Sequence, residues 1–161
     1  MLLPIALAII VSHPTGAVRC FVPGSPSQEL AKATAVFSGR VVGHDHVVEN
    51  TPSGESAQRL VANIAVVRVW KGNINPNVTV HTWEYLLHNG YLRIFGENFK
   101  FDDDTEYLVY AFGKSDHLWA DQCSRTRELS KAFDDLKELG DGHEPTPNKA
   151  LDARLDSLFL N

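Results

Sequence analysis

The chain has 161 residues, 43% of them hydrophobic, and its 15 Lys and Arg against 20 Asp and Glu give a formal net charge of −5. A mildly acidic chain with scattered basic residues has no electrostatic footprint for nucleic acid. The length suits one domain with a sizeable core, and no apolar segment of the sequence reaches the roughly 20 residues that a membrane-spanning helix needs.

The first predicted feature is a leader. Residues 2–11 form an uncharged apolar run, and the small residues at 15–17 suit signal cleavage. Since no Lys or Arg precedes the run, a buried N-terminal strand or helix is the alternative. We expect residues 1–17 to be a signal peptide, so that the mature, secreted chain begins at Val18.

The chain has two cysteines, Cys20 and Cys123. Two cysteines in an exported protein most simply pair with each other, and two free thiols are the alternative. A bond between them would close a loop of about 100 residues and remove roughly 4–5 kcal/mol of freedom from the unfolded chain. The sequon that begins at Asn77 also fits an exported protein, as a glycosylation acceptor in a host that glycosylates.

A short helix is predicted after the leader. Ser25 can cap it, Pro26 suits its first position, and Gln28 can reach back to the cap as in a capping box. The helix continues to Ala33, where the pattern changes to that of strands.

Five strands follow, separated by polar turns. β-branched residues and alternating polarity predict a long first strand, in which Gly39 and Gly43 indicate bulges or bends. Residues 91–95 are predicted to be irregular, and three aspartates form an acidic turn before the fourth strand. The strands cover residues 35–49, 59–72, 78–85, 107–112 and 117–123.

The C-terminal part is predicted to be helical. Hydrophobic residues at helical spacing predict a helix over residues 125–140, which Gly140 ends. A linker with two prolines follows, and residues 150–160 are typical of a short amphipathic helix docked on the body; two aspartates disfavour a helix lying on a membrane. The hydrophobic residues are Leu129, Phe133, Leu136 and Leu139 in the first helix and Leu151, Leu155, Leu158 and Phe159 in the second.

These elements indicate one mainly β domain over residues 18–140, with the linker and terminal helix over residues 141–161. Because strands do not alternate with helices, a small closed or partly closed β-barrel with flanking helices is favoured over a parallel sheet. The sequence contains no visible internal repeat.

Side chains suited to metal binding form no complete local set. His44 and His46 share a strand face without a third ligand nearby in sequence, so two exposed histidines are expected. Residues 102–104 with Glu106 lack the spacing of a calcium loop and are expected to form a solvated turn.

Catalytic motifs are absent from the sequence. It has no G-x-S-x-G, H-E-x-x-H or phosphate-loop motif, and neither Ser38 nor Ser124 has a base beside it. The three tryptophans at 70, 83 and 119 are expected to be core or barrel-end aromatics rather than a ligand cage. We expect no catalytic residues, no cofactor and no intrinsic metal; an enzyme whose residues meet only in the fold is the alternative.

Several segments occur together in an order known from one family. A cysteine near the mature N-terminus is followed by ELAKATAVFSGRV, VWKG, NGY, YLVYA and CSRT, and then by a predicted helix ending in LG. Over roughly residues 18–140 the chain resembles the tissue inhibitor of metalloproteinases (TIMP) family, especially its bacterial-type single-domain members. The resemblance implies the netrin-like module, an OB-fold-like five-stranded barrel with flanking helices.

Members of that family begin with Cys-x-Cys, and the second cysteine bonds to one at the position of Cys123. Cys20 resembles this second cysteine, so the first falls at Val18 and its usual mate at Asn89. One bridge is thus absent as a unit, which leaves no stray thiol, while the resemblance implies that the other, Cys20–Cys123, is kept.

The resemblance also implies a function. In the family, the α-amine and carbonyl of the first residue chelate the zinc of a metalloproteinase, and the side chain of the second enters its specificity pocket. In this sequence, the resemblance assigns the zinc-chelating role to Val18 and the pocket role to Arg19. We therefore expect a secreted, monomeric inhibitor of a zinc metalloproteinase, without nucleic-acid or membrane partners. The alternative is a non-inhibitory extracellular netrin-like protein-binding module.

Overall fold

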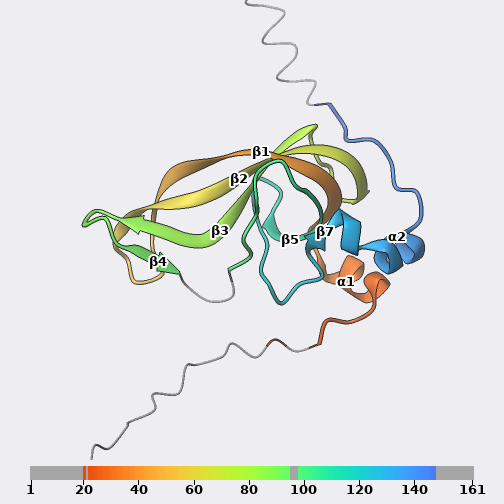
Figure 1. The fold of residues 1–161 in the computed structure, drawn as a ribbon, viewed down its shortest axis with the longest axis horizontal. Helices are drawn as coiled ribbons and strands as arrows, with labels where there is room; N and C mark the ends of the chain where they lie inside the picture. The colour runs from red at the N-terminus through yellow and green to blue at the C-terminus, as the bar shows by residue number, and fades with distance from the viewer. Residues whose placement is uncertain (1–19, 21, 95–97, 148–161) are drawn as a thin grey trace, which may run out of the picture.

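The computed structural model describes residues 20, 22–94 and 98–147, and this part of the chain is mainly β. In chain order its elements are α1 (Pro26–Lys32), β1 (Ala35–Asn50), β2 (Ser56–Lys71), β3 (Asn77–Leu87), β4 (Leu92–Ile94), β5 (Glu106–Lys114), β6 (His117–Trp119), β7 (Arg127–Glu128), the 3₁₀ turn η1 (Leu129–Lys131) and α2 (Phe133–Leu139). Helices α1 and α2 lie side by side at one end of the molecule, and β3 and β4 extend at the other (Figure 1).

Five strands close into a ring in the order β1-β2-β3-β6-β5. The ring closes because β1 pairs with β2 along one edge and with β5 along the other. β3 and β6 run parallel, and the other neighbours in the ring are antiparallel. A small five-stranded ring of this kind is typical of OB-type folds. The predicted fold class was a mainly β, OB-fold-like barrel of five strands with flanking helices, and the structure confirms a mainly β fold in which five strands form a ring and two helices flank it.

The pairing of β1 with β2 contains bulges, whereas its pairing with β5 is regular. Shifts in its pairing with β2 fall between Ser38 and Gly39 and between Val41 and Gly43, so the bulges predicted at the two glycines are confirmed. Gly39 lies tightly against β2, and a Cβ placed on it would come within 2.4 Å of the Ala65 carbonyl oxygen.

We expect Gly39→Ala to lower the free energy of unfolding by roughly 1–3 kcal/mol, because the added methyl group has to push the backbone of β2 away. Chemical denaturation measures the change. Val42→Ala is the control on the same strand: the Val42 side chain is 59% exposed, and its truncation should change stability by less than about 0.5 kcal/mol. Equal stability of the two variants would contradict the close approach.

The ring strands bury side chains on both faces. Val36 faces one hydrophobic cluster and Phe37 the other, and both are fully buried. The main cluster contains Phe37, Val41, Ile64, Val80, Val109 and Leu118 among others. The second cluster contains Ala33, Val36, Leu108, Tyr110 and Ala132, with Leu30, Leu129, Leu136 and Leu139 packed against it. This second cluster fixes the two helices to the ring.

The helix predicted over residues 125–140 is shorter in the structure. β7 pairs with β5 and η1 follows it, so α2 begins only at Phe133. Phe133, predicted to lie on the buried face, is 75% exposed, whereas Leu136 and Leu139 are packed as predicted. The prediction of length was wrong because pairing with β5 competes with helix formation over β7.

The region predicted to be irregular, residues 91–95, contains a strand instead. β4 pairs with β3, and the turn between them includes Asn89 and Gly90, with Gly90 at φ 79°. The Leu87 backbone N–H donates to the Tyr91 carbonyl at 2.9 Å. An Asn-Gly pair between two hydrophobic runs is a strong hairpin signal, and the sequence prediction missed it.

The segment after α2 runs along β2. His143 and Val69 exchange two backbone hydrogen bonds of 2.8 Å, and the Thr146 N–H donates to the Ile74 carbonyl at 2.9 Å. The predicted signal peptide and the C-terminal helix predicted over residues 150–160 lie outside the described residues. Within the described ranges, no helix combines the length and apolar character needed to cross a membrane.

Candidate functional site

The N-terminal end of the described chain is bonded to the segment that follows β6. Cys20 forms a disulfide with Cys123, with the Cα atoms 5.1 Å apart. The predicted pairing is confirmed, and the alternative of two free thiols is wrong. We use the name N-terminal anchor for five residues that fasten this end of the chain: Cys20, Gly24, Cys123, Arg125 and Asp135.

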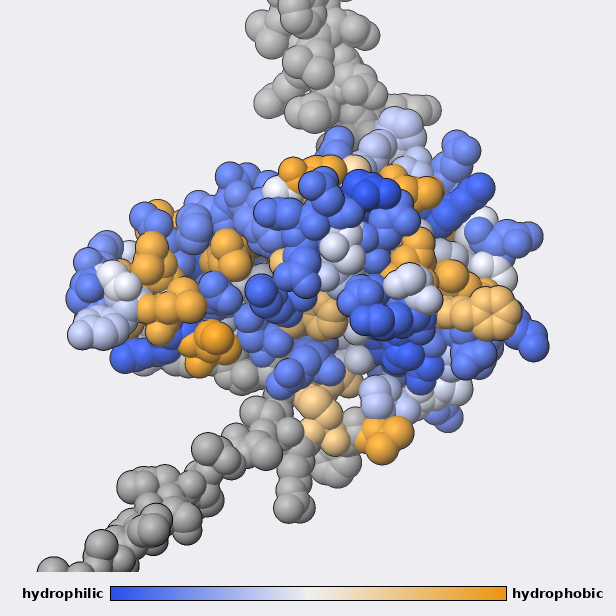
Figure 2. Space-filling view, viewed as in Figure 1, coloured by the Kyte–Doolittle hydropathy of each residue, from blue (hydrophilic) through white to orange (hydrophobic). Residues whose placement is uncertain are grey.

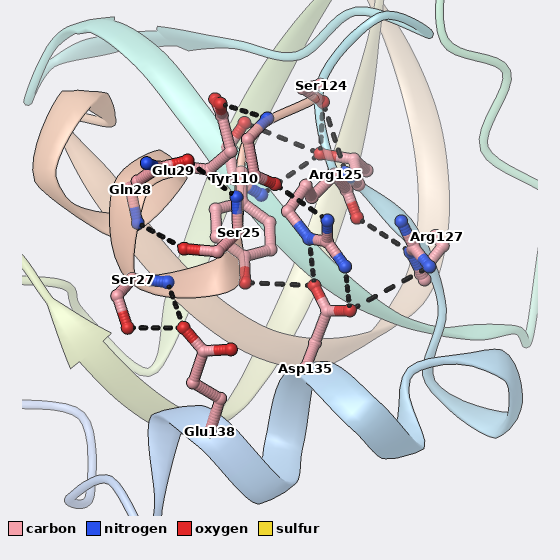
Figure 3. A network of polar contacts seen from close by, with 12 residues as sticks. Ser25, Ser27, Gln28, Glu29, Tyr110, Ser124, Arg125, Arg127, Asp135 and Glu138 are labelled. Atoms are coloured by element: carbon pink, nitrogen blue, oxygen red, sulfur yellow. Dashed lines mark hydrogen bonds and ion pairs between the residues drawn. The ribbon is translucent and has the colours of Figure 1, made fainter. Parts of the chain in front are cut away.

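Arg125 makes the central contacts of the N-terminal anchor (Figure 3). Its Nε and Nη2 donate to the two carboxylate oxygens of Asp135 at 2.7 and 2.6 Å, and its Nη1 donates to the Gly24 carbonyl at 2.8 Å. The Tyr110 hydroxyl donates to Asp135 Oδ2 at 3.0 Å. One guanidinium therefore ties the N-terminal segment to α2, and Tyr110 ties α2 to β5.

The N-terminal anchor contains a buried ion pair. Burial by itself raises the pKa of Asp135, but hydrogen bonds from Arg125 and Tyr110 and the charge of Arg127 outweigh it and place the pKa below its ordinary value. The hydrogen bond with Asp135 in turn raises the pKa of Arg125. Burial, and then Asp135, raise the pKa of Tyr110 and keep its hydroxyl a donor. At neutral pH the carboxylate and the guanidinium are therefore both charged.

The first turn of α1 fixes this helix against α2. The predicted capping box is confirmed: Ser25 Oγ accepts from the Gln28 N–H at 3.3 Å, and Gln28 Oε1 accepts from the Ser25 N–H at 2.9 Å. Ser27 donates to Glu138 Oε1 with its backbone N–H, at 2.9 Å, and with its hydroxyl (Figure 3). The segment after Cys20 is thus held by side chains as well as by the disulfide.

A second group of polar side chains, which we call the histidine cluster, comes from four neighbouring strands. It comprises Glu49 of β1, Arg59 of β2, His81 of β3 and His117 of β6. Arg59 Nη1 lies 3.2 Å from Glu49 Oε2 and 3.2 Å from His117 Nε2, and His81 Nδ1 lies 3.2 Å from Glu49 Oε1. Sequence analysis missed this cluster, because only the strand pairing brings its members together and no local motif marks them.

Aromatic rings and hydrogen bonds hold Arg59 in the histidine cluster. Its side chain is 10% exposed, and its guanidinium carbon lies 5.4 Å from the Trp83 ring centroid and 4.8 Å from that of Tyr85. Its Nη2 donates to the Tyr85 hydroxyl. These contacts provide cation–π attraction in addition to the ion pair with Glu49.

His81 is the most buried histidine-cluster imidazole. Its ring lies against that of His117, with centroids 3.8 Å apart and the ring planes tilted by 31°. Burial lowers the pKa of His81, and the charges of His117 and Arg59 lower it further against the opposing effect of Glu49. His81 is therefore neutral at neutral pH, which is the form that binds metal ions.

The histidines predicted on β1 differ from each other. His46 is exposed, as predicted. His44 was predicted to be exposed, but its side chain is only 20% exposed, and its Nδ1 lies 2.8 Å from Asp103 Oδ1 of the acidic turn. Of the tryptophans, Trp70 packs against the second hydrophobic cluster, and Trp83 meets Trp119 edge to face at 5.5 Å.

No family model matches the chain, and no curated protein matches it. Val18 and Arg19, the inhibitory residues implied by the resemblance, lie outside the described residues, immediately before the anchored Cys20. Asn77 is exposed at the first position of β3, and its glycosylation stays a prediction. Asn89 lies in the β3–β4 turn, where its Oδ1 accepts from the Tyr91 N–H at 3.1 Å.

Proposed function

We propose that this chain is a TIMP-like inhibitor of a zinc metalloproteinase, with the α-amine and carbonyl of Val18 as zinc ligands and Arg19 as the pocket residue. The N-terminal anchor is the observation that carries the proposal. An inhibitor that binds through its first residues needs the segment behind them fastened to a rigid body. The Cys20–Cys123 disulfide and the contact of Arg125 with Gly24 fasten that segment.

The chemistry at Val18 needs no thiol. An α-amino group has a pKa near 8, so a useful fraction at neutral pH is unprotonated and able to bind zinc. Two residues of chain reach about 7 Å at most, so the disulfide at Cys20 keeps this amine close to the domain. Because the chain lacks the family's first bridge, we expect a lower affinity than a bridged N-terminus would give, since ordering a residue on binding costs free energy.

Arg19 restricts the choice of protease. A guanidinium that enters a purely apolar pocket loses its hydration without compensation, whereas a carboxylate in the pocket forms strong bidentate hydrogen bonds with it. We therefore expect the target protease to carry an acidic residue in its specificity pocket.

The test compares the mature chain, beginning at Val18, with a variant that has one extra alanine before Val18. The extension moves the α-amine away from the zinc while leaving the N-terminal anchor unchanged. We expect the mature chain to inhibit at least one member of a panel of zinc metalloproteinases, and the extension to weaken this inhibition at least about tenfold through the loss of metal ligation.

Val18→Ala, with the same free N-terminus, is the matched control and should inhibit like the mature chain. N-terminal sequencing verifies where each protein begins, and thermal unfolding verifies that all three are equally folded. Equal inhibition by the extended chain would contradict the mechanism. A complete lack of inhibition by the mature chain across the panel would contradict the function.

A second candidate function, a non-inhibitory extracellular binding module, is favoured by the β3–β4 hairpin. Tyr91, Leu92 and Ile94 are 71%, 58% and 55% exposed, and hydrophobic side chains gather at this end of the molecule (Figure 2). A partner other than a protease, recovered from extracellular fractions by the mature chain but not by a Leu92→Ser/Ile94→Thr variant, would support this function. Recovery of metalloproteinases alone would count against it.

A further inference from the structure

Three side chains of the histidine cluster are types that bind metal ions. Glu49, His81 and His117 each offer one ligand atom, and these atoms all lie within 4.8 Å of one another. We propose that the three residues form a binding site for a divalent transition-metal ion, with Zn²⁺ as the representative. The site is independent of the proposed inhibitory function.

The distances within the histidine cluster are close to those of a zinc site. Zn²⁺ holds imidazole nitrogens and carboxylate oxygens at about 2.0–2.2 Å in a tetrahedron, which puts neighbouring ligand atoms about 3.4 Å apart. Glu49 Oε1 and His81 Nδ1 are 3.2 Å apart. The His117 ring lies beside that of His81, so a rotation of this imidazole brings the third ligand in. Water takes the fourth position.

His81 gives the strongest indication of a ligand. Its side chain is 10% exposed, and within the described part of the chain its Nδ1 has no partner in hydrogen-bonding geometry, although Glu49 Oε1 lies 3.2 Å away. Buried polar atoms are normally hydrogen-bonded, and leaving one unpaired costs about 1–3 kcal/mol. An ion placed between the nitrogen and the carboxylate would use a lone pair of each.

The ring of strands positions the three ligands in advance. Glu49 lies on β1, His81 on β3 and His117 on β6, and β3 pairs directly with β6. Ligands on paired strands are held more precisely than ligands on loops. The site therefore needs side-chain adjustment but no change in the backbone.

Arg59 is a competing cation in the same place. Its Nη1 lies near Glu49 Oε2 and His117 Nε2, both at 3.2 Å. With an ion bound to Glu49 Oε1, Arg59 can still donate a hydrogen bond to Glu49 Oε2, as outer hydrogen-bond donors do for metal-bound carboxylates. It can also keep its hydrogen bond to the Tyr85 hydroxyl. It has to release His117, and its positive charge repels the ion. We expect these effects to make the site one of moderate affinity.

The ligand set selects the class of ion. Two imidazoles and one carboxylate suit Zn²⁺, Cu²⁺ and Ni²⁺. Ca²⁺ and Mg²⁺ prefer sets made of oxygen ligands. We therefore expect an excess of Ca²⁺ not to displace a transition-metal ion from the histidine cluster.

In the test, the full chain is titrated with Co²⁺. This ion binds at zinc sites, and its visible absorption spectrum reports the coordination geometry around it. The protein carries no histidine tag, keeps its disulfide and is first treated with a chelator. We expect one Co²⁺ per chain with the absorption of a four- or five-coordinate ion, displaced by Zn²⁺. His117→Gln and Glu49→Gln should each weaken binding at least about tenfold. The control His46→Gln removes an exposed histidine of β1 and should leave binding unchanged.

The variants of the histidine cluster also have to be checked for folding. His117 is only partly buried, so His117→Gln is the less disruptive removal of a histidine, and circular dichroism checks its fold. If it does not fold, Glu49→Gln, which keeps the size of the side chain, decides alone. The absence of stoichiometric Co²⁺ and Zn²⁺ binding by the unaltered chain would overturn the proposal. Binding that survives Glu49→Gln, or that is lost in His46→Gln, would also overturn it.

Discussion

The double variant Cys20→Ser/Cys123→Ser is expected to have a free energy of unfolding about 2–5 kcal/mol smaller than that of the unaltered chain. The disulfide joins residues 103 positions apart. On the chain-entropy model, a closed loop of this length removes roughly 4–5 kcal/mol of freedom from the unfolded state, and the double variant regains that freedom. Chemical denaturation of the two proteins at one pH measures the difference.

Reduction of the unaltered chain is the control, since it should reproduce the loss, whereas reductant should not affect the double variant. The contacts of Arg125 with Gly24 and of Ser27 with Glu138 do not involve the two cysteines, so we expect the double variant to keep them and its far-UV circular dichroism to match that of the unaltered chain. Equal stability of the two proteins would contradict the role of the bond. If the chain inhibits a protease as proposed, the double variant should inhibit more weakly than its folded fraction explains, because the bond that fastens Cys20 is gone.

Asp135→Asn is expected to lower the free energy of unfolding by about 3–5 kcal/mol. The Asp135 side chain is 1% exposed and Arg125 is 16% exposed, so the substitution leaves a mostly buried guanidinium without its counter-charge. Asp134→Asn is the matched control, because it removes the neighbouring carboxylate of the same helical turn from an exposed position. Its effect should stay within about 0.5 kcal/mol. Similar losses in both variants would contradict the role of the buried pair.

The pH dependence of stability distinguishes Asp135 from the other carboxylates. Its pKa is lower in the folded chain than in the unfolded chain. Its contribution is therefore present in full above the unfolded-state pKa of about 4, and it is lost as the pH falls through the lowered folded value. The stability difference between the unaltered chain and Asp135→Asn should shrink over this acid range. A difference that stays constant there would show that Asp135 acts through its shape and not its charge.

Sequence analysis correctly predicted the structural features that depend on only a few adjacent residues. The capping box at Ser25 and Gln28 is such a case, since both partners lie within one helical turn. The bulges at Gly39 and Gly43 are another, because a glycine within an alternating run marks the place where a strand bends. The long alternating segments likewise indicated the ring strands and their hydrophobic faces.

Contacts between distant segments decided the features that sequence analysis missed. The start of the predicted helix over residues 125–140 pairs with β5 instead, and nothing in its own hydrophobic spacing indicates that pairing. The histidine cluster depends in the same way on the registers between β1 and β2, between β2 and β3, and between β3 and β6. The N-terminal anchor was predicted only through its cysteines, because the contacts of Arg125 with Gly24 and Asp135 become visible only in the fold.

The span of the disulfide determines what a proteolytic cut does to this molecule. All strands from β1 to β6 lie between Cys20 and Cys123, so a single cut in any turn among them leaves two pieces still joined by a covalent bond. Such a nicked chain keeps its mass under non-reducing conditions and separates into fragments only after reduction. If the partners of this protein are proteases, its turns can be cut while the N-terminal residues stay attached to the domain.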